Sequence, residues 1–193
     1  VLAVALGGAL ALRAQTGGEL YVRHVGVADG LAESSVTALA QDARGFVWLG
    51  TPEGLSQYNG YSFRTFKHRP SDSTSIIDNA ITALAADSAA LWVGTSNGLS
   101  RLDLATGQAR GYAGPGRPGA WLPDRVVTAV LPAPGGAWVG TRGGLAWVAA
   151  GGGAPSRGAR HLAGAPIRAL FATPRGPVAV AEAGVYRYDG RAW

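Results

Sequence analysis

Short runs of alternating apolar and polar residues, separated by turn residues, cover much of the chain. Residues 36–41 alternate, with Val36, Ala38 and Ala40 on one face, and an Asp-x-x-Gly turn follows at residues 42–45. Residues 46–51 are rich in β-forming side chains, residues 52–54 make a second turn, and residues 55–58 and 62–67 continue the pattern. The pattern predicts four strands joined by tight turns, the last with a polar, solvent-facing side.

This pattern recurs along the chain. A Trp-x-Gly-Thr phrase begins at Trp48, Trp92 and Trp138, which are 44 and 46 residues apart, and a Gly-Leu pair starts three residues after each Thr. A fourth unit, residues 167–189, keeps its first apolar strand and its Tyr-Asp ending but has Val-Ala-Val-Ala at residues 178–181 in place of the Trp phrase. A fixed period of this length is typical of stacked or ringed supersecondary units.

Four short antiparallel strands per unit predict the blade of a β-propeller. No stretch keeps a helical period, which argues against a helical repeat. A β-sandwich is the alternative, although it would not need the same Trp in every unit.

The phrases around the first unit resemble a known family. They are Asp29-Gly30-Leu31, the run from Gln41 to Thr51, Gly54-Leu55 and Tyr58-Asn59-Gly60-Tyr61. Together and in this order they resemble the two-component regulator propeller repeat, well over residues 20–148 and weakly over residues 149–193. The resemblance implies the extracytoplasmic sensor region of bacterial histidine kinases and hybrid two-component regulators. It also implies a ring of about seven blades, of which this chain would supply about four.

The chain has no Met, so we expect it to be a fragment. Residues 1–12 are an apolar run and Ala14 offers a small residue at a cleavage site, which predicts a truncated signal peptide over residues 1–14; a buried element or a retained anchor is the alternative. Residues 15–193 are then the N-terminal part of the propeller, with units near residues 36–67, 81–112, 127–148 and 167–193. Residues 20–25 alternate and are assigned to the strand that closes the ring.

The amino-acid composition excludes some kinds of functional site. The chain has no Cys, which excludes disulfides and thiolate metal sites. Its formal net charge is +5, but the basic residues are scattered and form no stripe or recognition module. We therefore expect no nucleic-acid binding.

Most of the conspicuous residues have structural explanations. The repeated Trp residues are expected to fill the gaps between blades rather than to bind a ligand. Residues 114–119 match the Gly-x-Gly-x-x-Gly pattern of a dinucleotide-binding loop. Two prolines interrupt the pattern and no helix follows it, so we expect an ordinary loop. His24, His68 and His161 are far apart, and Asp42 and Asp87 occupy equivalent turns. The sequence thus predicts no catalytic residue, no metal ligand and no cofactor.

Two longer insertions join one unit to the next, at residues 67–79 and 111–123. Loops on a rigid scaffold commonly carry specificity, so these are the segments most expected to face a ligand. A solvated linker is the plainer alternative, and the ligand-binding residues stay unknown. The segments contain these candidates: Lys67, His68, Arg69, Asp72, Arg117 and Trp121.

Together these observations favour a periplasmic sensor that binds a small molecule or an oligosaccharide and signals to an output domain, most often a histidine kinase. By resemblance the parent protein would be a homodimer attached to the inner membrane by later segments. The chain itself is expected to catalyse nothing. A free-standing secreted binding or scaffold propeller and a propeller enzyme (hydrolase, lyase or oxidoreductase) are the alternatives.

Overall fold

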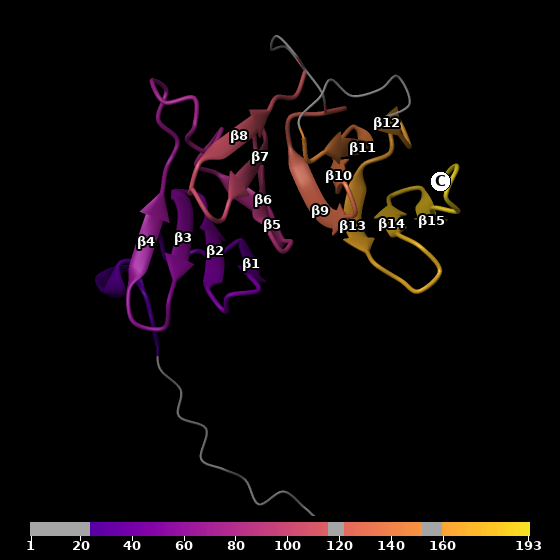
Figure 1. The fold of residues 1–193 in the computed structure, drawn as a ribbon. Coiled ribbons are helices and arrows are strands. Elements are labelled where there is room, and N and C mark those ends of the chain that lie inside the picture. Colours follow the sequence, from indigo (N-terminus) through magenta and orange to yellow (C-terminus); the bar gives the residue numbers. More distant parts are fainter. Residues whose placement is uncertain (1–23, 116–121, 152–159) are drawn as a thin grey trace, which may run out of the picture.

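The chain folds almost entirely into antiparallel sheet. The computed structural model describes residues 24–115, 122–151 and 160–193. Within these ranges the strands form four sheets, in each of which the strands pair in chain order (Figure 1). Three of the sheets have four strands and the last has three. The only helical element described is a short 3-10 turn, Val27–Asp29. The predicted all-β propeller architecture with about four blades is confirmed.

Each blade is a meander, and its strands are as follows. Blade 1 contains β1 (Ala38–Gln41), β2 (Val47–Thr51), β3 (Gly54–Tyr58) and β4 (Phe63–Phe66). Blade 2 contains β5 (Ile81–Ala86), β6 (Ala90–Thr95), β7 (Gly98–Asp103) and β8 (Ala109–Tyr112). Blade 3 contains β9 (Val127–Ala133), β10 (Gly136–Thr141), β11 (Gly144–Ala149) and β12 (Arg160–His161). Blade 4 contains β13 (Ile167–Phe171), β14 (Val178–Ala181) and β15 (Gly184–Arg187).

The first strands of the four blades lie next to one another. β1 contacts β5, β5 contacts β9, and β9 contacts β13, while β4 and β8 lie on the outer edges of their blades (Figure 1). The first strand is shorter than the sequence predicts, because it begins at Ala38 and Val36 is 44% exposed before it. The expected closing strand at residues 20–25 and the expected signal peptide fall largely or wholly outside the described residues.

The Gly of each Trp-x-Gly-Thr phrase receives a side chain of the next blade. A Cβ added to Gly50 would lie 2.5 Å from Ile81 Cγ2, and one added to Gly94 would lie 2.6 Å from Val127 Cγ1. Gly140 repeats the arrangement with Ile167. Because these distances are shorter than any normal carbon contact, only Gly lets consecutive blades approach this closely.

A second repeated contact is a hydrogen bond from blade to blade. The Thr37 hydroxyl donates to the Ile81 carbonyl at 2.7 Å, and the Thr82 hydroxyl donates to the Val127 carbonyl at 2.7 Å. The Thr128 hydroxyl donates to the Ile167 carbonyl at 2.6 Å. A Thr next to the first residue of each of the first three units thus ties its blade to the following one. The Val-Thr and Ile-Thr pairs are visible in the sequence, but their role was missed.

The repeated Trp residues are buried, as predicted. Trp48 is 2% exposed, Trp92 is 0% exposed and Trp138 is 6% exposed. Each contacts a ring on the outer strand of its own blade, and those rings occupy equivalent positions opposite the Leu of the Gly-Leu pair. The pairs are Trp48 with Phe66, Trp92 with Tyr112, and Trp138 with His161.

Blades 3 and 4 depart from the sequence expectation. The outer strand β12 was not predicted, since it follows an insertion after residue 149. In blade 4, three strands are described where four were expected. Trp193 takes the position that Phe63 has at the start of β4, after a Tyr188 turn that repeats the Tyr58 turn of blade 1. Its ring lies 5.0 Å from that of Trp138 and helps to fill the gap between blades 3 and 4.

Candidate functional site

Residues 67–80 cross over from β4 to β5, and this crossover is folded on itself. The Asp72 carboxylate accepts hydrogen bonds from the Thr74 amide at 2.9 Å and the Thr74 hydroxyl at 2.6 Å. The Ser75 hydroxyl accepts from the Arg69 amide and donates to the Asp72 carbonyl. The His68 ring donates from Nδ1 to the Ile76 carbonyl at 2.8 Å. These bonds give the segment a defined turn structure.

Blade 2 holds this crossover in place. Ile76 is 2% exposed, and the Ile77 amide donates to the buried Ser100 hydroxyl at 2.9 Å. The Ala109 amide of β8 donates to the Thr74 carbonyl at 2.7 Å. Blade 1 has a matching anchor, in which the Ala32 amide donates to the buried Ser56 hydroxyl. The crossover is therefore a fixed wall beside the gap between blades 1 and 2.

A cavity of about 210 Å³ lies between this wall and β4. A second cavity of about 240 Å³ lies beside it, and the two share Arg64, Phe66, Leu102 and Gly107. Both are therefore parts of one groove, which we call the inter-blade groove. Its first cavity is lined by these residues: Arg64, Thr65, Phe66, Lys67, Arg69, Asp72, Thr74, Ser75, Ile76, Leu102, Gly107 and Ala109.

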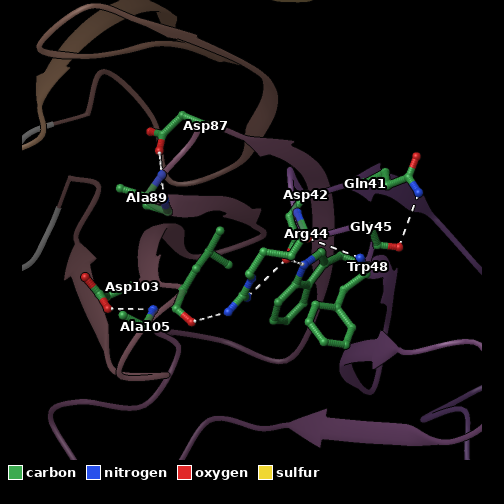
Figure 2. A network of polar contacts seen from close by, with 12 residues as sticks. Gln41, Asp42, Arg44, Gly45, Trp48, Asp87, Ala89, Asp103 and Ala105 are labelled. Atoms are coloured by element: carbon green, nitrogen blue, oxygen red, sulfur yellow. Dashed lines mark hydrogen bonds and ion pairs between the residues drawn. The ribbon is translucent and has the colours of Figure 1, made fainter.

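A buried polar network supports the second cavity (Figure 2). Asp42 is 4% exposed, and its carboxylate accepts hydrogen bonds from the Trp48 indole at 3.0 Å and from the amides of Arg44 and Phe46. The Arg44 guanidinium donates to Asp42 at 3.1 Å and to the Leu104 carbonyl of blade 2 at 3.0 Å. The network thus fixes the orientation of Trp48 and bridges two blades.

These contacts also set the ionisation of Asp42. Burial by itself raises the pKa of this carboxyl group, but the hydrogen bonds from Trp48, Arg44 and Phe46 favour the charged form and outweigh burial. The pKa of Asp42 is consequently below its ordinary value, and Asp42 is a carboxylate at neutral pH.

Blade 2 repeats part of this network. The Trp92 indole donates to Asp87 at 2.8 Å, and the amides of Ala89 and Ala90 donate to the same carboxylate. In blade 3 the corresponding residue is Ala133, which has no polar side chain. Asp42 and Asp87 therefore hold turns and indoles in place, which agrees with their equivalent positions in the sequence.

The basic side chains around the first cavity differ in their partners. The Arg64 guanidinium lies over the Phe66 ring, with its Cζ atom 4.7 Å from the ring centroid. The Lys67 Nζ atom lies 4.0 Å from the Glu53 Oε2 atom, and both side chains are at least half exposed. The pKa of Asp72 is lowered, first by the Thr74 hydrogen bonds and also by the charge of Arg69. The Asp72 carboxylate is thus used in hydrogen bonds within its own turn.

The structure brings some of the predicted candidates together. Lys67, Arg69 and Asp72 all line the first cavity, whereas His68 does not and instead lines a neighbouring hollow. Arg117 and Trp121 lie outside the described residues. Arg64 and Arg44 were missed, because their roles depend on contacts between β4, the first hairpin and blade 2.

The three histidines do not converge. His68 belongs to the crossover and His161 packs on Trp138, where burial lowers the pKa of its ring. In the described ranges, no three His, Cys, Asp or Glu side chains are grouped as a metal ion would require. Nor do these ranges contain a helix with the length and hydrophobicity needed to cross a membrane.

Four antiparallel meanders packed blade against blade define a β-propeller. Residues 30–53, which contain the Asp42 turn and the first Trp phrase, match the family model described as two component regulator propeller. The matched segment is the first unit, whose sequence resembles that repeat.

One protein of known sequence and two solved structures are similar to parts of this chain. Over 68 residues the chain is 38% identical to histidine kinase P4 of Formosa agariphila; the match covers 35% of this chain and 5% of that protein. The extracellular domain of the putative hybrid two component system BT3049 from B. thetaiotaomicron superposes with a TM-score of 0.67 at 23% identity, covering 86% of this chain and 26% of that one. The extracellular domain of the putative hybrid two component system BT4673 from B. thetaiotaomicron superposes with a TM-score of 0.63 at 23% identity, covering 80% of this chain and 21% of that one. At this identity the likeness shows the fold, and the chain spans about a quarter of each solved domain.

Proposed function

We propose that this chain is part of an extracytoplasmic sensor propeller, which binds a ligand and passes the signal to an output domain elsewhere in its parent protein. The observation that carries the proposal is the match of residues 30–53 to the two-component regulator propeller, set in a fold of four packed blades. The similarity to a histidine kinase makes a histidine kinase the favoured output. In this proposal the chain itself is not catalytic.

Two further features support a binding role. The Gly and Thr contacts described above join consecutive blades into a stiff frame, and the folded crossover forms one wall of the inter-blade groove. Ligand sites are commonly built from loops on such frames. We propose a periplasmic location, membrane attachment through other segments, and a homodimeric parent that does not bind nucleic acid through this part.

Protease accessibility tests the location. In spheroplasts of the source bacterium, with the parent protein tagged at its output domain, added protease should remove the propeller and leave a protected output fragment. Propellers that are cut only after lysis would contradict an extracytoplasmic sensor.

The reading frame beyond Trp193 gives an independent check: further propeller repeats, a membrane span and a kinase core are expected. A frame with no membrane span would favour a secreted binding propeller, and acidic or His residues converging on the ring axis would favour an enzyme.

A further inference from the structure

The first cavity of the inter-blade groove combines positive charge with a rigid support. Three basic residues and one acidic residue line it, namely Arg64, Lys67, Arg69 and Asp72. The acidic residue is held by its own turn through Thr74, so its hydrogen-bonding capacity is partly used. A group that enters the cavity therefore meets an excess of cationic donors.

Arg64 is supported by a series of aromatic contacts. Its guanidinium Cζ atom lies over the Phe66 ring, the Phe66 ring centroid lies 5.5 Å from that of Trp48, and the Trp48 indole donates a hydrogen bond to buried Asp42. A guanidinium placed over an aromatic ring keeps its N–H edges free for a planar anion. None of the described carboxylates forms an ion pair with Arg64.

The size of the cavity limits what it can hold. Sites for drug-sized ligands have volumes of roughly 300–1,000 Å³. A cavity of about 210 Å³ suits one charged group or a single small ring. Arg64 also lines the second cavity of about 240 Å³, so a longer ligand has room to continue past it.

We propose that the inter-blade groove is a binding site for an oxyanion group, such as carboxylate, sulfate or phosphate, held by Arg64, Lys67 and Arg69. Guanidinium and ammonium groups form charge-assisted hydrogen bonds with all three oxyanions, and Arg binds them in a bidentate manner. The proposal names the ligand chemistry of the proposed sensor and to that extent rests on it. Binding by this chain can nevertheless be measured without any output domain.

The test is isothermal titration of the 193-residue chain at constant ionic strength with sodium sulfate, sodium phosphate and sodium glucuronate, with glucose as the uncharged match to glucuronate. We expect saturable one-to-one binding of at least one anion, no binding of glucose, and weaker binding at higher salt because exposed charges are screened. The anion that binds best distinguishes a free inorganic ion from an acidic sugar.

Variants locate the site. Arg64→Gln should weaken binding about tenfold or more, as should Arg69→Gln, because each removes charge-assisted hydrogen bonds. Arg142→Gln is the matched control, since it removes the same charge from an exposed turn of blade 3. Circular dichroism confirms that each variant is folded. Absence of binding by all three anions, or equal affinities for wild type and Arg64→Gln, would overturn the proposal. Neither result would change the outcome of the protease experiment. The binding site and the proposed sensor function are therefore tested independently.

Discussion

Replacing Gly94 by Ala tests the contact between blades 2 and 3. The added methyl group would lie 2.6 Å from Val127 Cγ1 and 3.1 Å from Ala83 Cβ. Both neighbours are buried, and Val127 is 0% exposed. Neither side chain has a flexible end that could move aside, so the two blades must separate slightly to admit the methyl group.

The expected cost follows from two opposing effects. Overpacking of a core typically costs about 1–3 kcal/mol. Ala in a strand regains roughly 0.5–1 kcal/mol of the backbone entropy that Gly loses. We therefore expect Gly94→Ala to lower the free energy of unfolding by about 1–2 kcal/mol, which corresponds to a fall in melting temperature of roughly 2–8 °C for a chain of this size.

A double-mutant cycle identifies the contact. Val127→Ala removes the clashing methyl groups and by itself costs about 2 kcal/mol. In Gly94→Ala/Val127→Ala the new methyl group occupies part of the vacated space. The double variant should therefore be more stable than the sum of the single effects, by about 1 kcal/mol or more.

Urea denaturation followed by tryptophan fluorescence measures each free energy. Gly151→Ala is the control, because a Cβ there meets no atom within 4 Å, and its effect should stay within about 0.5 kcal/mol. The reasoning is refuted if Gly94→Ala is as stable as wild type, or if the two substitutions are additive within about 0.5 kcal/mol.

Three further predictions concern the repeated contacts. Trp92→Ala should destabilise the protein by about 3–5 kcal/mol in the same denaturation assay, because Trp92 is fully buried between blades; a loss below about 1 kcal/mol would contradict that placement. Thr82→Val removes the hydrogen bond to the Val127 carbonyl with little change of shape, and should cost about 1 kcal/mol in melting experiments; an unchanged melting temperature would show that this bond adds nothing. Asp42 has a folded-state pKa below its ordinary value. Its contribution to the free energy of unfolding is therefore fully present at pH values above the ordinary Asp pKa and is lost as the pH falls through the folded-state pKa. Asp42→Asn should therefore be about 1–3 kcal/mol less stable than wild type at pH 7, and the two should converge as the pH is lowered towards 2; a constant difference across that range would show that the carboxylate charge is not the cause.

Much of each blade could be predicted from the sequence because its contacts are local. The Asp42 turn, the Trp48 strand and the Gly54 turn lie within about a dozen residues, and antiparallel hairpins join residues that are close in the chain. Blade 4 shows the limit of this approach. Without the Trp phrase this unit was recognised by its apolar strand, its Gly184 turn and its Tyr-Asp ending, and nothing in the sequence assigned a role to Trp193, which with the Tyr188 turn repeats the geometry of blade 1.

The candidate site could be predicted only in part. The length of the insertion at residues 67–79 marked it as a candidate, and Lys67, Arg69 and Asp72 do line a cavity. Nothing in the sequence marked Arg64 as a site residue. Its position depends on a series of contacts, in which Arg64 lies over Phe66, Phe66 contacts Trp48, and Trp48 donates a hydrogen bond to Asp42. His68 was a candidate by position, but its ring is used in a hydrogen bond within the crossover.

By itself the sequence determined the repeat and therefore the blade. A period of 44 to 46 residues with Trp, Gly and Thr at equivalent places requires each unit to meet the same surroundings. Tertiary structure alone decided which residues of different blades touch: Gly94 with Val127, Thr37 with Ile81, and Arg44 with Leu104. These partners are separated by whole strands and turns. Only the packing of complete blades brings them together, and that packing also creates the groove in which we place the ligand.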